Sequence, residues 1–249
     1  MSLRILNASG TDVITRETAS PAVVSLSRSA NLEIFHPGAR LPTDDLIIQC
    51  EAHLETGFSD SDPVATFTDQ SGSNDLTQAT ESKKPTFKTN KVNSQPALYF
   101  DGGDGLASPS IDLSANDTLS VYIIGTIDGS PGGSYHHVWG YMAGLTDGTG
   151  DFLQMYQTTS ASDLVQNPSG MTDITGSNWT TTFDGVTTIF DGTADHQLYQ
   201  GSTEEGDVSG SQNIGSSSFE FYVGEWNSNY LLGHIASFIA YNVAHDAAT

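Results

Sequence analysis

Residues 119–129 read LSVYIIGTIDG, a run of apolar, β-branched and aromatic residues closed by an Asp-Gly pair. Such residues favour the pleated surface of a β-strand, and Asp-Gly supplies the positive φ angles of a tight reversal. The chain of 249 residues has six Asp-Gly pairs, which begin at Asp101, Asp104, Asp128, Asp147, Asp184 and Asp191. No stretch of ten or more residues keeps a helical apolar period. The sequence therefore predicts an all-β protein.

Further runs of this kind follow Pro42 at regular spacing. Ten strands are expected, at 46–50, 64–68, 97–100, 119–127, 137–141, 152–156, 186–190, 196–200, 219–224 and 232–241. This number of short strands fits two packed antiparallel sheets with Greek-key connections. A single domain of this length is also common among sandwiches. We expect a two-sheet antiparallel jelly-roll sandwich.

The N-terminal 42 residues differ from the rest in charge. Residues 1–40 carry four arginines against three acidic residues, whereas the whole chain has a net charge of −22. The stretch ends in PGARLP at 37–42, a turn and linker signal. Its two expected strands, 4–6 and 22–26, are too few to bury a core. We therefore predict an N-terminal arm and linker at 1–42, followed by the sandwich at 43–249.

The arm must pack against its own sandwich or against a neighbouring subunit. For the second case, Arg4, Arg16 and Arg28 are the expected contacts, since the guanidinium fork pairs well with carboxylates. The arm then predicts assembly into a homo-oligomer or with other coat subunits.

The body of the chain is strongly acidic. All eight basic residues lie at or before Lys91, and from Val92 onward there are 18 acidic residues and no Lys or Arg. Such a surface repels nucleic acid and anionic membranes. No apolar run approaches the ~18 residues of a membrane span. We expect neither nucleic-acid binding nor membrane insertion.

Two motifs carry a resemblance to a known family. Residues 67–75 read FTDQSGSND, and residues 93–102 read NSQPALYFDG. Together with the later patterns at 191–201, 222–224 and 233–242, they resemble laminin-G-like domains of the concanavalin A-like lectin and glucanase superfamily. The resemblance covers roughly 46–242 and implies a jelly-roll sandwich. Asp69 is expected to accept backbone N–H bonds within its turn. Members of the superfamily include glycan-binding lectins, glucanases, adhesion modules and parts of phage heads and tails.

Catalytic patterns are missing from the sequence. Glycosidases of this superfamily place Glu, Asp and Glu at alternate positions of one strand, and no such run exists here. Glu220 and Glu225 are an odd number of residues apart, and 204–207 is expected to be a turn. His136 and His137 are expected at an exposed turn, because neighbours on a strand point to opposite faces and cannot share one metal ion. No catalytic residue is assigned, although a glycoside hydrolase stays an alternative.

Binding candidates come from two loop regions rich in aromatic and polar residues, around 135–141 and 225–230. The candidate glycan contacts are Trp226, Asn227, Asn229, Tyr230, Tyr135 and Trp139. Most Trp side chains of a sandwich belong to the core, which explains Trp139 better than a ligand does. Asp101 and Asp104 offer close oxygen ligands for calcium, with a plain hydrated turn as the alternative.

We interpret the chain as a non-enzymatic structural and binding protein of a phage virion surface, in a head decoration, fibre or tail. In this interpretation the arm docks the subunit on the virion, and the lectin-like sandwich adheres to glycans of the host surface. The alternatives are a free, extracellular glycan-binding lectin and a glycosidase of the same fold. Fold alone does not choose among them.

Overall fold

The structure is a computed structural model whose chain divides into two compact units, Met1–Leu41 with Asp246–Thr249 and Pro42–His245. It describes residues 4–6, 12–15, 43–113, 118–129, 135–142, 153–158, 164–168, 173–177, 179, 181–191, 195–209 and 220–245. In the first unit, β1 (Arg4–Leu6) and β2 (Asp12–Thr15) pair as an antiparallel hairpin. The strand expected at 4–6 is therefore present, while the one expected at 22–26 lies outside the described residues.

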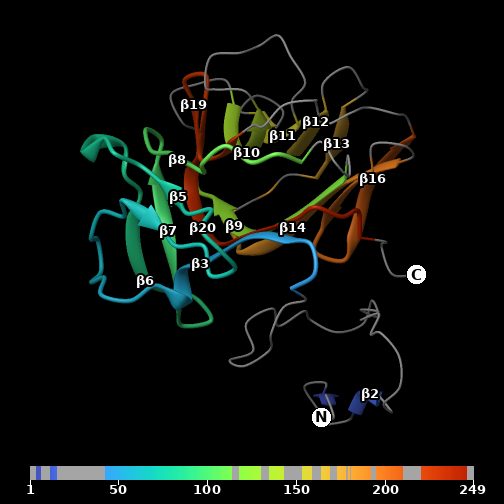
Figure 1. The fold of residues 1–249 in the computed structure, drawn as a ribbon, viewed down its shortest axis with the longest axis horizontal. Helices are drawn as coiled ribbons and strands as arrows, with labels where there is room; N and C mark the ends of the chain where they lie inside the picture. Colours follow the sequence, from blue (N-terminus) through green and yellow to red (C-terminus); the bar gives the residue numbers. More distant parts are fainter. Residues whose placement is uncertain are drawn as a thin grey trace. The chain divides into compact units, whose positions relative to one another are not determined.

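The second unit contains two large sheets (Figure 1). Within the described residues, the first sheet has eight strands in the order β13-β12-β11-β10-β17-β8-β5-β4. Their bounds are β4 Thr66–Phe67, β5 Leu76–Thr77, β8 Leu106–Ala107, β10 Tyr135–Met142, β11 Leu153–Thr158, β12 Leu164–Pro168, β13 Ile174–Gly176 and β17 Glu220–Val223. All of their pairings are antiparallel.

The second sheet follows the order β16-β15-β14-β9-β20-β7-β6, and β3 also pairs with β20. Its strands are β3 Leu46–Glu51, β6 Thr86–Val92, β7 Gln95–Asp101, β9 Thr118–Ile127, β14 Asp184–Asp191, β15 Asp195–Gln200, β16 Thr203–Ser209 and β20 Leu232–Tyr241. Two short 3-10 helices, η1 (Ala52–Leu54) and η2 (Glu81–Lys83), interrupt the strands. Among the described residues, no helix has the length and apolar character needed to cross a membrane.

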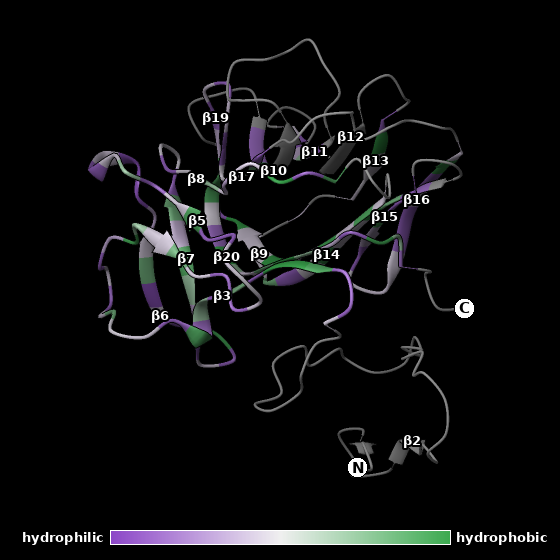
Figure 2. Ribbon diagram, in the orientation of Figure 1, coloured by the Kyte–Doolittle hydropathy of each residue, from purple (hydrophilic) through white to green (hydrophobic). Residues whose placement is uncertain are grey.

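The core lies between the two sheets. Phe221 on β17 of the first sheet packs edge-on against Phe238 on β20 of the second, with ring centroids 5.8 Å apart. Trp139 on β10 is fully buried and packs on Phe221. Hydrophobic residues recur along strands of both sheets, whereas the edge strand β16 and most of the coloured connecting segments are hydrophilic (Figure 2). The prediction of an all-β, antiparallel jelly-roll sandwich is confirmed.

The turn around Asp69 matches its sequence-based expectation. Asp69 is buried, and its Oδ1 accepts the backbone N–H groups of Ser71 and Gln49, each at 2.9 Å. Its Oδ2 accepts the N–H of Asn74 at 3.0 Å. Because Gln49 belongs to β3, this single carboxylate fixes the turn after β4 to a strand of the second sheet.

Several elements differ from the sequence-based expectations. The strand expected at 64–68 is only Thr66–Phe67, because the N–H of Val64 binds the carbonyl of Pro85 outside the sheet ladder. The expected turn at 204–207 is wrong, since these residues belong to β16. β6 was not expected from the sequence, and Asp184-Gly185 begins strand β14 instead of forming a turn.

Candidate functional site

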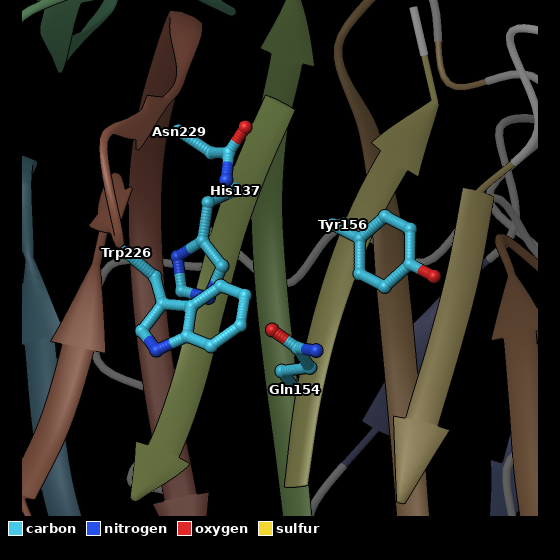
Figure 3. A pocket seen from close by; sticks show the side chains of 5 residues that line it. All are labelled: His137, Gln154, Tyr156, Trp226 and Asn229. Atoms are coloured by element: carbon cyan, nitrogen blue, oxygen red, sulfur yellow. The ribbon is translucent and has the colours of Figure 1, made fainter. Parts of the chain in front are cut away.

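A pocket of about 250 Å³ opens on the first sheet, beside a small hairpin that follows β17. The hairpin consists of β18 (Glu225–Trp226) and β19 (Asn229–Tyr230). The lining residues come from β10, β11 and this hairpin: His137, Gln154, Tyr156, Trp226 and Asn229. Figure 3 shows the Trp226 ring next to His137, with Gln154 and Tyr156 on the neighbouring strand.

A β-bulge in β10 turns His137 toward the pocket. His137 lies opposite Tyr156 and Trp139 lies opposite Met155, so Val138 is an extra residue between two consecutive pairs. On a regular strand, His137 and Trp139 would share a face because side chains alternate with period two. The inserted residue breaks that alternation. As a result Trp139 enters the core, while His137 shares the pocket face with Gln154 and Tyr156.

Backbone geometry also sets the course of the hairpin. Gly224, with φ of +83°, turns the chain out of β17, and a Cβ at this position would lie 2.4 Å from the ring of Phe100. The two loop residues Asn227 and Ser228 have φ of 46° and 63°, as a two-residue type I′ turn requires. Trp226 therefore pairs with Asn229, and Glu225 pairs with Tyr230. Each pair occupies one face of the hairpin.

The first face, with Trp226 and Asn229, forms one wall of the pocket. The centroid of the Trp226 ring lies 5.9 Å from that of His137, and the ring planes are tilted by 33°. Trp226 is half-buried and lines the pocket, whereas His137 is only 1% exposed. The wall thus combines a partly exposed aromatic residue with a buried imidazole.

The imidazole of His137 is neutral and has no hydrogen-bond partner among the described residues. Burial lowers the pKa of His137 to about 3, so the ring carries no charge at neutral pH. Among the described residues, neither Nδ1 nor Nε2 has a hydrogen-bond partner. An unpaired buried polar group costs about 1–3 kcal/mol of stability. A neutral imidazole has one N–H donor and one acceptor nitrogen. Both nitrogens are buried, so a ligand bonds to them only after a neighbouring side chain, such as that of Trp226, has shifted.

The second face of the hairpin, with Glu225 and Tyr230, is anchored by Lys83 at the end of η2. The Lys83 ammonium lies 2.5 Å from Oε1 of buried Glu225, and 5.7 Å from the centre of the Tyr230 ring. The hydrogen bond to Glu225 raises the pKa of Lys83. In addition, the backbone N–H of Leu231 binds the carbonyl of Gly224 at 2.8 Å and closes the base of the hairpin.

The predicted glycan contacts therefore separate into groups. Trp226 and Asn229 line the pocket, but Tyr230 lies on the opposite face with Lys83. Asn227 is exposed at the turn and is not one of the described lining residues. Trp139 must be corrected as a candidate, because a ring with no exposed surface cannot stack on a sugar.

The remaining aromatic and histidine expectations concern β10. Tyr135 begins this strand opposite Thr158, and its side chain lies outside the described residues. The expectation of an exposed turn at His136 and His137 is wrong, because both are strand residues that are buried. Sequence reasoning missed His137, Gln154 and Tyr156 as pocket residues. No local signal marks the bulge that brings them together.

Asp101 and Asp104, the calcium candidates, form a hydrogen-bonded turn. Oδ2 of Asp104 accepts the N–H of Asp101 at 2.9 Å, and Oδ1 of Asp101 accepts the N–H of Gly103 at 2.9 Å. Burial, followed by the nearby charge of Asp101, raises the pKa of Asp104 to about 7. In the part of the chain that the structure describes, no cluster of three or more His, Cys, Asp or Glu side chains is arranged to hold a metal ion.

The assembly candidates fall in the first unit. Arg4 lies in β1, whereas Arg16 and Arg28 lie outside the described residues.

Comparison with known proteins finds similar solved structures. No family model matches the sequence, and no curated protein matches it. A sialidase from Trypanosoma rangeli, in complex with sialic acid, is similar with a TM-score of 0.57 and 16% identity, over 84% of this chain and 32% of the sialidase. This chain thus spans about a third of the sialidase's length.

Two further solved structures are similar to this chain. Domain 4 of AbnA, a GH43 extracellular arabinanase from Geobacillus stearothermophilus in complex with arabinotriose, has a TM-score of 0.54 and 14% identity, with 77% of this chain and 100% of the domain covered. The binding domain of Paraclostridial Mosquitocidal Protein 1 has a TM-score of 0.59 and 13% identity, with 82% and 50% covered. At these identities the likeness establishes a shared β-sandwich fold.

Proposed function

We propose that the sandwich is a carbohydrate-binding module whose site is the pocket between β10, β11 and the β18–β19 hairpin. The observation that carries the proposal is His137, a buried neutral imidazole that lines the pocket and has no partner among the described residues. The half-buried ring of Trp226 lies directly beside it. A polar group held unpaired next to a partly exposed aromatic residue suits a ligand with both apolar and polar faces.

A sugar ring has that character, since its C–H groups form an apolar face and its hydroxyls both donate and accept hydrogen bonds. The C–H face would lie on Trp226, and a hydroxyl would bond to His137. The other lining residues include the amide groups of Gln154 and Asn229 and the Tyr156 hydroxyl, which are donors and acceptors as well. Ligand sites of this kind combine apolar walls with a few convergent polar groups. The arabinanase domain of the same fold was solved with arabinotriose, which supports the proposal.

Binding without cleavage is favoured by the chemistry of the lining. Glycoside hydrolysis generally needs two carboxyl groups that flank the bond, and the described lining residues include none. Glu225, the carboxylate of the hairpin, is paired with Lys83 on its other face.

Sialidases form an exception to the two-carboxyl rule, since their nucleophile is a tyrosine. In this chain Tyr222 donates its hydroxyl proton to Glu220, and burial raises the pKa of Tyr222. Glu220 could act as a base toward this hydroxyl, but neither Tyr222 nor Glu220 is among the described residues that line the pocket. A reducing-sugar assay on polysaccharides tests the glycosidase alternative.

The wider setting of the module is a second proposal. We propose that residues 1–42 attach it to a larger assembly, such as the surface of a phage virion, through other coat subunits or copies of itself. The supporting observation is the change of charge, from +1 over residues 1–40 to strongly acidic afterwards. A free extracellular lectin is the alternative, and cryo-EM of the native assembly distinguishes the two.

Replacement of Trp226 tests the binding proposal. A glycan array with the intact protein identifies a ligand, and calorimetry then compares wild type with Trp226→Ala. We expect at least about a tenfold loss of affinity, or about 1.4 kcal/mol, because the stacking surface is removed. The melting temperature should change little, since the ring is half-buried on a hairpin and lies outside the core.

Tyr199→Ala is the matched control, because it removes a half-buried aromatic side chain from β15 of the second sheet. It should leave the affinity unchanged. Full retention of binding by Trp226→Ala, or equal losses in both variants, would rule the pocket out.

A further inference from the structure

The described wall of the pocket has no positively charged side chain. No Lys or Arg is among its described lining residues, and no Lys or Arg occurs anywhere after Lys91. The segments that follow β10 and β11 and lie outside the described residues, 143–152 and 159–163, therefore bring no basic side chain to the site. The four arginines all occur in the first 40 residues, and none is among the described lining residues.

The lysine nearest to the hairpin is already paired. Lys83 bonds to Glu225 at 2.5 Å, on the face of the hairpin opposite Trp226 and Asn229. Lys84 pairs with Glu81, and Lys88 donates to the hydroxyl of Ser61. His137 is the remaining nitrogen base in the pocket, and burial holds its pKa near 3, so it is uncharged at neutral pH.

A carboxylate or sulfate group in this pocket would lose water without gaining a cation. Burial of an unpaired charge is strongly unfavourable, and proteins that bind such groups usually supply Arg or Lys. The net charge of −22 adds repulsion at longer range. Neutral hydroxyls, in contrast, match an imidazole with one donor and one acceptor, and also match the amides of Gln154 and Asn229.

The size of the pocket limits the ligand further. A volume of about 250 Å³ lies below the roughly 300–1,000 Å³ of pockets that enclose drug-sized molecules. It holds about eight water molecules at about 30 Å³ each, which corresponds to about one sugar ring, so further rings of a chain would lie outside the pocket.

We propose that the pocket binds a single neutral pentose or hexose ring at the end of an oligosaccharide and excludes sugars that carry a carboxylate or sulfate. This inference rests on the proposed carbohydrate-binding function. It predicts that this pocket does not accept sialic acid, which is bound in the sialidase structure of similar fold.

Matched sugar pairs test the inference by calorimetry. Oligosaccharides that end in glucose, galactose or mannose are compared with those that end in the corresponding uronic acid, and with arabinotriose and sialic acid. Each uronic acid differs from its partner only at C6, so stacking is retained while a charge is added. We expect the neutral member of the pair that binds to be at least about tenfold tighter.

Measurements at high salt distinguish the effect of the pocket on affinity from the effect of the protein's net charge. Long-range repulsion is screened at 0.5 M salt, where the Debye length is only a few Å, but an unpaired buried charge is not. The preference should therefore persist. In Asn229→Lys, which places a cation at the pocket wall, the uronic acid should gain affinity relative to its neutral partner.

The outcomes are distinct. If no sugar binds, the proposed function itself is wrong, and this inference fails with it. If a uronic acid or sialic acid binds wild type as tightly as the neutral partner, the function stands and the exclusion is wrong. If the preference disappears at 0.5 M salt, the pocket is not its source, and the inference is again overturned.

Discussion

His137 destabilises the free protein if its two ring nitrogens have no partner. Its imidazole is 1% exposed and neutral, and among the described residues nothing compensates for the water it has lost. Functional groups held in this way lower stability in exchange for binding. The stability and the affinity of a variant at this position should therefore change in opposite directions.

We expect His137→Leu to melt at the same temperature as wild type or higher. Leucine is apolar and of similar size, so it removes the cost of about 1–3 kcal/mol that an unpaired buried polar group imposes on the folded state. The same variant should lose sugar binding. Thermal melts and calorimetry on one preparation measure both properties. Destabilisation by more than about 2 kcal/mol would indicate that His137 has a structural hydrogen bond, contrary to the site described here.

The pH dependence of folding stability tests the environment of the Asp104 carboxyl group. Its pKa is raised from 3.8 to about 7, with burial as the largest cause. Between these two values the folded state binds a proton that the unfolded state has released, so stability decreases as pH rises. The decrease is at most about 1.4 kcal/mol for each pH unit.

Asp104→Asn stays uncharged and keeps an oxygen for the N–H of Asp101. We expect its melting temperature to rise relative to wild type as pH increases from about 4 to 8, while contributions of other groups cancel in the difference. Parallel melting curves for the two proteins across this range would mean that the Asp104 carboxyl is already ionised in the folded state.

The β18–β19 hairpin joins the pocket wall to an ion pair. Glu225 and Trp226 are adjacent on β18, so the contact of Glu225 with Lys83 fixes the strand that carries the Trp226 ring. Since Glu225 is buried, its carboxylate needs this partner more than an exposed carboxylate would. Lys83 is therefore expected to act on binding through the position of the hairpin, without ligand contact.

Lys83→Met should lower stability by about 1–3 kcal/mol, because it leaves a buried carboxylate unpaired. Affinity for sugar should fall several-fold as the hairpin loosens. Lys84→Met is the matched control: its partner Glu81 is largely exposed, and such pairs contribute about 0–1 kcal/mol. Adding Glu225→Gln to Lys83→Met should restore part of both losses. If the two lysine variants behave alike, the ion pair does not position the hairpin.

Strand prediction succeeded where the apolar pattern is strong and failed at the edges. β9 and β20, in the middle of the second sheet, are long apolar strands and were expected from the sequence. β6 and β16 are edge strands with mostly polar or exposed residues, so they lack the alternation that marks a half-buried strand.

The candidate site was only partly predictable for a similar reason. Polar and aromatic composition indicated Trp226 and Asn229, both of which line the pocket. The exclusion of Tyr230 depends on hairpin register, and the inclusion of His137 depends on the bulge at Val138. Both are decided by pairing with other strands, which the local sequence does not encode.

The division of the chain into two compact units bears on assembly. Pro42–His245 contains the described hydrophobic core, from Ile48 on β3 to Ala240 on β20. This unit should therefore fold without the residues that precede it. Only removal of those residues can test the proposed role of the arm.

Deletion of residues 1–40 should leave a cooperative melt and unchanged sugar binding, but abolish assembly, as measured by light scattering. Moderate salt should weaken the assembly of the full chain only partly, because surface ion pairs contribute about 0.2–1 kcal/mol each and apolar contacts must add to them. A truncated protein that aggregates, or that loses its cooperative melt, would instead make the arm part of the sandwich fold.

The indole N–H signals of the three tryptophans test sugar binding at the pocket most directly. Trp139 and Trp179 are buried, at 0% and 1% exposed, whereas Trp226 lines the pocket. In a two-dimensional NMR titration with the neutral oligosaccharide selected by the array, we expect the Trp226 signal to shift and saturate while the other two stay in place. The spectrum of Trp226→Ala assigns that signal. A saturable interaction that leaves the Trp226 signal unmoved would show that the sugar binds elsewhere and would contradict the site.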